Sequence, residues 1–178
     1  VVIYTVLDKT MIGFITCSSY ENGYYEQAIK LSKMALTIVT SLGIVMIPRI
    51  GYYFGKGEKE QVLFFMYKAY RFVWFLGIPL TFGLLGTASN FVPWFFGDGF
   101  EPVSGLLIYS SLLILTLSWS SILGKQLLIG CNREKDYTIA VFWGAAANLL
   151  LNYLQIPFYG ATGATISSIV AEYSGMLI

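Results

Sequence analysis

The sequence predicts an all-α integral membrane protein with about six membrane-spanning helices, on two observations. Hydrophobic residues make up 56% of the 178 residues and charged residues 12%, whereas soluble domains average about 45–50% and about 25%. Charge-free runs cover residues 72–97 and 102–124, and each reaches the ~20 residues that cross a hydrocarbon core. Both runs therefore predict spanning helices.

The first two spans are predicted at residues 1–19 and 28–48. The apolar stretch within the second is short, so Lys30 and Lys33 would have to extend it by placing their ammonium groups at the membrane surface. The chain starts without a methionine and both of its ends lie in apolar segments. We therefore expect a fragment of a longer polytopic protein, truncated at both ends.

Four more spans follow, the third at residues 72–96 and the fourth at 103–124. No charge occurs from residue 137 to 171, and one straight helix of that length would measure roughly 50 Å at 1.5 Å per residue, too long for one crossing. Proline and glycine interrupt helices, so we expect a break at Pro157 and Gly160. The last two spans are then residues 137–156 and 160–178.

The charged connections predict the orientation. Lysines and arginines gather in the predicted loops 49–71 and 125–136, which the positive-inside rule places in the cytoplasm. The other connections then face outward, and the six spans alternate consistently. We expect a multi-pass protein of the cell membrane, in contact with membrane lipid.

The sequence lacks the residues that several kinds of functional site require. The chain has no histidine and two cysteines, and Cys17 and Cys131 are expected on opposite sides of the membrane. We therefore expect no metal site, no cofactor and no histidine-based catalysis. A net charge of +1 and scattered lysines argue against a nucleic-acid partner. The predicted outer loops are short, whereas an intramembrane transferase would carry a sizeable loop with catalytic groups. An enzyme is therefore the less favoured class of protein.

Polar residues form stripes on the predicted helices. In the first span, Asp8 and Lys9 are neighbours, and adjacent helical side chains point about 100° apart rather than facing each other. Each therefore needs a partner on another helix or a polar ligand. Further stripe residues are Thr5 in the first span, Thr37 and Thr40 in the second, and Asn148 and Asn152 in the fifth. Interhelical hydrogen bonds and a ligand explain the asparagines equally well.

Small residues recur every fourth position in the last span, at Gly163, Ser167, Ala171 and Gly175. Small side chains at this spacing allow two helix backbones to approach closely. The stripe predicts close contact with another helix.

Four short motifs carry a resemblance to a known family. They are Leu-Asp-Lys-Thr at residues 7–10, Gly-Tyr-Tyr at 23–25, Pro-Arg at 48–49 and Tyr-Gly-Ala-Thr-Gly-Ala at 159–164. With them, essentially the whole chain resembles the Wzx-type polysaccharide flippases of the multidrug/oligosaccharidyl-lipid/polysaccharide exporter superfamily. The resemblance implies one lobe of a twelve- to fourteen-helix, two-lobe protein whose first lobe is missing here. It also implies location in the bacterial cytoplasmic membrane.

The same resemblance implies a function and a set of site residues. Members carry undecaprenyl-diphosphate-linked oligosaccharide from the cytoplasmic to the outer leaflet by alternating access. Lys9, and secondarily Arg49, would then meet the diphosphate, because cationic donors suit phosphate oxygens. Asp8 would pair with a cation of the missing lobe or take part in ion coupling. Sugar hydroxyls would bond to Thr5, Thr37, Thr40, Asn148 and Asn152.

Two other functions stay open. A multidrug or metabolite antiporter of the same superfamily would share the architecture. A non-transporting membrane scaffold that binds lipid-linked precursors would share the polar stripes.

Overall fold

The computed structural model describes residues 2–177, and within that range it contains helices and no strand. The prediction of an all-α fold is therefore confirmed. The helices are α1 (Val2–Thr16), α2 (Ser19–Gly55), α3 (Lys59–Phe96), α4 (Glu101–Ser120), the π-helix η1 (Ser121–Ile129) and α5 (Glu134–Met176).

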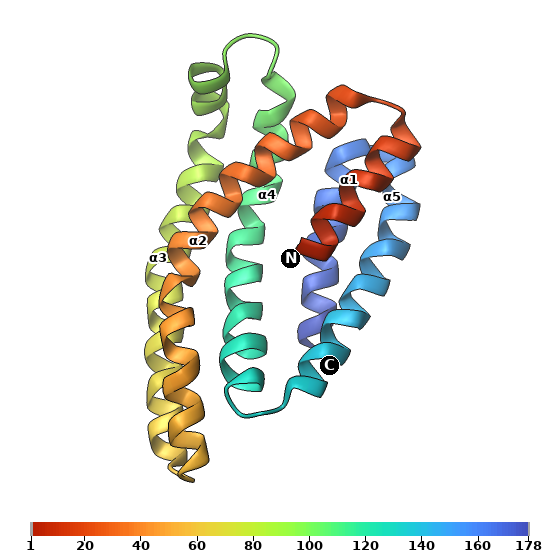
Figure 1. Cartoon of the computed structure of the whole chain (residues 1–178). Coiled ribbons are helices and arrows are strands. Elements are labelled where there is room, and N and C mark those ends of the chain that lie inside the picture. Colours follow the sequence, from red (N-terminus) through yellow and green to blue (C-terminus); the bar gives the residue numbers. More distant parts are fainter. Residues whose placement is uncertain (1, 178) are drawn as a thin grey trace.

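Four helical stretches are long and apolar enough to cross a membrane: α2, α3, α4 together with η1, and α5. Large apolar side chains such as Phe75 and Phe142 are exposed on their surfaces, which suits contact with lipid. The chain is thus a multi-pass membrane protein. Helix α5 turns back on itself at Gly160 (Figure 1), so its arms 134–159 and 161–176 run side by side. The boundaries of the six spans stay a prediction.

The connections differ from the loops expected at residues 49–71 and 125–136. Helix α2 continues to Gly55 and α3 begins at Lys59, while η1 ends at Ile129 and α5 begins at Glu134. Most of each predicted loop is therefore helical. A continued helix satisfies the backbone N–H and C=O groups of these residues. Contacts between the extended helix ends, such as the stacked rings of Tyr53 and Phe65 with centroids 5.4 Å apart, add stability.

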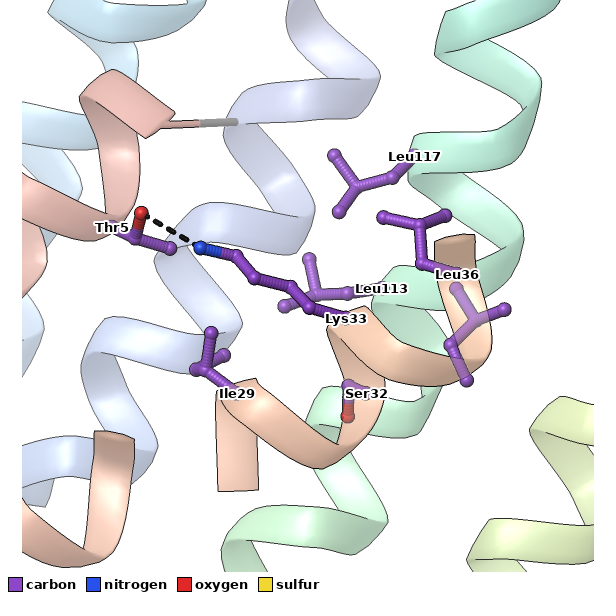
Figure 2. Close-up of a pocket in the computed structure, with 8 residues that line it drawn as sticks. Thr5, Ile29, Ser32, Lys33, Leu36, Leu113 and Leu117 are labelled. Atoms are coloured by element: carbon purple, nitrogen blue, oxygen red, sulfur yellow. Dashed lines mark hydrogen bonds between the residues drawn. The ribbon is translucent and has the colours of Figure 1, made fainter. Parts of the chain in front are cut away.

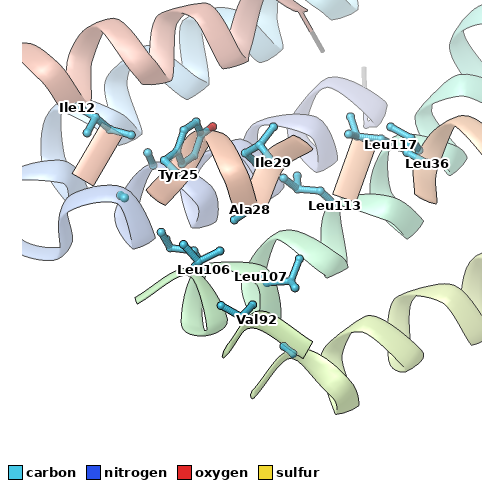
Figure 3. Packing of buried hydrophobic residues seen from close by; sticks show 14 of the residues in the cluster. Ile12, Tyr25, Ala28, Ile29, Leu36, Val92, Leu106, Leu107, Leu113 and Leu117 are labelled. Carbon is cyan, nitrogen blue, oxygen red and sulfur yellow. The ribbon is translucent and has the colours of Figure 1, made fainter. Parts of the chain in front are cut away.

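The helices form two groups that meet in one apolar core. Helices α2, α3 and α4 pack together, and α1 packs chiefly against α5 (Figure 1). Side chains from both groups join near the upper end of Figure 1, the end with the α1–α2 turn and the α5 turn. Figure 3 shows Ile12 of α1, Tyr25 of α2, Val92 of α3 and Leu107 of α4 in this core, all fully buried.

The small-residue stripe of the last arm lies against the first arm of α5. A Cβ atom at Gly175 would approach the carbonyl oxygen of Ala140 to 3.0 Å, and one at Gly163 would approach that of Gln155 to 2.7 Å. These distances leave no room for a larger side chain. The predicted close helix contact is confirmed.

A glycine and a carboxylate shape the turn of α5. Gly160 has φ +54°, a conformation that costs other residues free energy, and a Cβ there would collide with the carboxylate of Glu21. The same carboxylate accepts a hydrogen bond of 2.9 Å from the backbone N–H of Ala161. A negative charge is favourable at the start of a helix, so Glu21 ties α2 to the second arm.

We expect Gly160→Ala to destabilise the protein by about 1–3 kcal/mol, because it adds backbone strain and displaces Glu21. The matched control is Gly83→Ala on α3, where a Cβ would meet nothing within 4 Å. The measurement is the melting temperature in detergent. Equal melting temperatures for the two variants would contradict this account of the turn.

The two cysteines provide a test of the orientation. Cys17 is exposed in the α1–α2 turn, whereas Cys131 lies in the η1–α5 turn at the opposite end (Figure 1), where burial raises the pKa of its thiol. In intact cells, a membrane-impermeant maleimide should label a variant that retains only Cys17. A variant that retains only Cys131 should react after permeabilisation, and slowly, since thiolate is the reactive form. The reverse pattern would refute the orientation.

Candidate functional site

The carboxylate of Asp8 is fully buried at the centre of a polar network. Its Oδ1 accepts hydrogen bonds from the side-chain amides of Asn148 at 3.1 Å and Asn152 at 2.6 Å. Its Oδ2 accepts from the hydroxyls of Tyr25 at 2.5 Å and Ser168 at 2.6 Å. An ionised carboxylate offers about four lone-pair sites, so all of its accepting positions are used.

The spacing of these residues along the chain explains why they meet. Asn152 lies eight residues before Gly160 and Ser168 eight residues after it, so the two lie at the same level of the α5 hairpin. Asp8 lies eight residues before the end of α1 at Thr16. At 1.5 Å per residue, the network lies roughly 12 Å below the upper end of these helices.

The partners of Asp8 within the described residues are four neutral donors of α2 and of both arms of α5. Pairing with a cation of a missing lobe, or a part in ion coupling, stays a prediction. A buried charge must be paired or hydrogen-bonded, and this one is hydrogen-bonded within the bundle. Of the two explanations left open for Asn148 and Asn152, the structure shows interhelical hydrogen bonds.

Lys9 takes a different direction from Asp8. Its Nζ lies 2.9 Å from Oε1 of Glu26 on α2, and the same oxygen lies 3.2 Å from Nζ of Lys30. The prediction that Asp8 and Lys9 each find a partner on another helix, rather than each other, is therefore confirmed.

A small groove of about 20 Å³ lies between α1, α2 and α4, with Lys33 on its lining. Figure 2 shows Lys33 reaching across it to α1, where its Nζ donates a hydrogen bond of 3.2 Å to Oγ1 of Thr5. Apart from these residues and Ser32, the lining is apolar, with Ile29, Leu36, Leu113, Ile114 and Leu117. We call Lys9, Glu26, Lys30 and Lys33 the cationic cluster. Three lysines and one glutamate give it a net charge of +2.

The remaining predicted residues lie outside this cluster. The hydroxyls of Thr37 and Thr40 donate to backbone carbonyls one turn back in α2, at 2.8 and 2.9 Å. Arg49 is exposed near the end of α2, with its guanidinium carbon 5.8 Å from the centre of the Phe65 ring. It lies 19 residues from Lys30 along α2, roughly 29 Å at 1.5 Å per residue. Substrate-binding roles for these residues stay predictions.

Five residues of the site were not among those predicted from the sequence: Tyr25, Glu26, Lys30, Lys33 and Ser168. The four-residue spacing of Glu26 and Lys30 on one helix is a recognisable signal. Ser168 could have been found because it lies as many residues after Gly160 as Asn152 lies before it. Among the described residues, no group of three or more histidine, cysteine, aspartate or glutamate side chains could hold a metal ion.

We expect Asp8→Asn to destabilise the protein by at least about 3 kcal/mol, because an amide nitrogen would face two buried donors that need an acceptor. The control is Asp98→Asn, at an exposed carboxylate in the α3–α4 turn. Melting temperature and yield of monodisperse protein are the measurements. An Asp8→Asn variant as stable as Asp98→Asn would show that the network contributes little.

Three relatives align with most of this chain. It is 25% identical over 170 residues to a protein named "Putative O-antigen transporter" from Shigella dysenteriae, covering 96% of this chain and 42% of that protein. It is 23% identical over 167 residues to an uncharacterized membrane protein of Methanocaldococcus jannaschii, covering 94% and 33%. It is 24% identical over 152 residues to the lipid II flippase MurJ of Bacillus subtilis, covering 83% and 28%. The chain therefore spans less than half the length of each.

No solved structure matches the chain. The family model described as "Polysaccharide biosynthesis protein" matches residues 1–105, which include the whole cationic cluster and Asp8. Because this match covers more than half of the 178 residues, the chain belongs to the polysaccharide biosynthesis protein family.

Proposed function

We propose that this chain is part of a transporter, not an enzyme, that flips undecaprenyl-diphosphate-linked oligosaccharide from the cytoplasmic to the outer leaflet by alternating access. The family and the names of two relatives, an O-antigen transporter and a lipid II flippase, support a lipid-linked substrate. Such a protein would be complete only with a second lobe facing this one, giving twelve to fourteen helices.

The observation that carries this proposal is the cationic cluster beside an apolar groove. Lys9 and Lys33 come from different helices: Lys9 of α1 pairs with Glu26 of α2, and Lys33 of α2 donates to Thr5 of α1. Each phosphate of a diphosphate diester carries one ionised oxygen, so the substrate headgroup matches the net charge of the cluster. Ammonium groups donate charge-assisted hydrogen bonds to such oxygens. The apolar side chains beside Lys33 would contact the lipid part of the substrate.

The other predicted residues take supporting roles in this proposal. Arg49, near the cytoplasmic end, would make a first contact with the headgroup before it reaches Lys9. Thr5, Thr37 and Thr40 would bond sugar hydroxyls. Asn148 and Asn152 would act through Asp8, which keeps α1 in its orientation.

We expect Lys9→Gln to reduce export of surface polysaccharide about tenfold or more, since a charge-assisted contact to the headgroup is lost. Lipid-linked oligosaccharide should accumulate in the cytoplasmic leaflet of cells carrying this variant. The assay is complementation of a gene deletion at equal expression. The control is Lys135→Gln, at an exposed lysine at the start of α5, which should export normally.

Full export by Lys9→Gln would contradict the proposed site. A deletion strain that becomes sensitive to drugs without accumulating lipid-linked oligosaccharide would favour an antiporter. Reversal of the accumulation by a variant that does not flip the lipid in proteoliposomes would favour a scaffold over a flippase.

A further inference from the structure

We propose that Glu26 is an internal substitute for the substrate's diphosphate: it binds Lys9 and Lys30 while the groove is empty and gives them up when the headgroup enters. This inference rests on the proposed function. It assigns Glu26 the role of a positioning residue that controls how tightly the headgroup is held.

The geometry of the ion pairs supports an exchange. One oxygen, Oε1 of Glu26, contacts the ammonium groups of both Lys9 and Lys30, at 2.9 and 3.2 Å. The three side chains are 39%, 36% and 55% exposed, so water and an incoming anion can reach them. Ion pairs with this exposure contribute little net free energy to stability. A diphosphate with several acceptor oxygens can therefore displace the single carboxylate.

Lys33 offers the headgroup its first contact within the cationic cluster, after Arg49 at the cytoplasmic end. It lies three residues beyond Lys30 on α2, on the wall of the groove, and its Nζ is bonded to the Thr5 hydroxyl. Among the described residues, no carboxylate lies within ion-pair distance of its ammonium group. An arriving phosphate would thus bind Lys33, which forms no ion pair with a carboxylate of the described residues, before it competes with Glu26 for Lys9 and Lys30.

A competing carboxylate also explains how the headgroup could leave. Without Glu26, three ammonium groups of like charge would lie close together and repel one another. Such a site would bind a diphosphate tightly and release it slowly. Because Glu26 returns to Lys9 and Lys30 as the headgroup departs, it lowers the cost of the empty state and speeds release.

The test compares binding with turnover in the full-length protein. Glu26→Gln should bind undecaprenyl diphosphate about three- to tenfold more tightly than wild type, because one competing negative charge is removed. Flipping of the lipid-linked oligosaccharide in proteoliposomes should nevertheless become slower at saturating substrate. Glu26→Asp, which keeps the charge on a shorter side chain, should lie between the two. The control Glu58→Gln alters an exposed carboxylate at the start of α3 that makes no side-chain capping bond, and should change neither quantity.

A merely structural role for Glu26 would weaken binding and slow flipping together, and that result would overturn the inference. Unchanged or weaker binding by Glu26→Gln, in a protein whose Lys9→Gln variant does lose affinity, would overturn the inference alone. If wild-type protein binds undecaprenyl diphosphate no better than undecaprenyl monophosphate, the proposed function fails and the inference fails with it. Melting temperatures of Glu26→Gln and Glu26→Asp would confirm that both variants are folded.

Discussion

The hydrogen bonds to the buried carboxylate of Asp8 are the constraint on which the rest of the site depends. Moving a carboxylate out of water costs several kcal/mol even after the protein relaxes, and four neutral donors offset that cost here. The donors lie on α2 and on both arms of α5, so α1 can satisfy Asp8 in one orientation.

The orientation of α1 has a direct consequence for Lys9. Adjacent residues on a helix point about 100° apart, so when Asp8 is fixed inside the bundle, Lys9 is directed toward Glu26 on α2. The inward residue thereby fixes the helix, and the outward residue is left to form an exposed ion pair. Under the proposed function, this division between a rigid interior and a weakly paired surface would suit a site that binds and releases an anion.

Much of the fold could be predicted from the sequence because membrane helices leave simple signals. Charge-free runs located α3 and α4, and the combination of Pro157 and Gly160 located the turn of α5. Helix ends were less accessible: α2 continues through Gly55, beyond the predicted membrane boundary, because a helix need not end where the lipid does. The full register of the α5 hairpin depends on the exact position of Gly160.

The site was predictable only in part, for the same reason. Adjacent charges at Asp8 and Lys9 indicated that each needs a partner elsewhere, but the identity of that partner depends on contacts between distant segments. Ser168 lies 160 residues from Asp8, and no local pattern connects them.

The most direct test of the account is a cryo-electron microscopy structure of the protein as the cell expresses it, with the proposed lipid-linked oligosaccharide added. The account predicts diphosphate density between Lys9 and Lys33, with Asp8 still bonded to Tyr25 and Asn152; density away from the α1–α2 groove would contradict it.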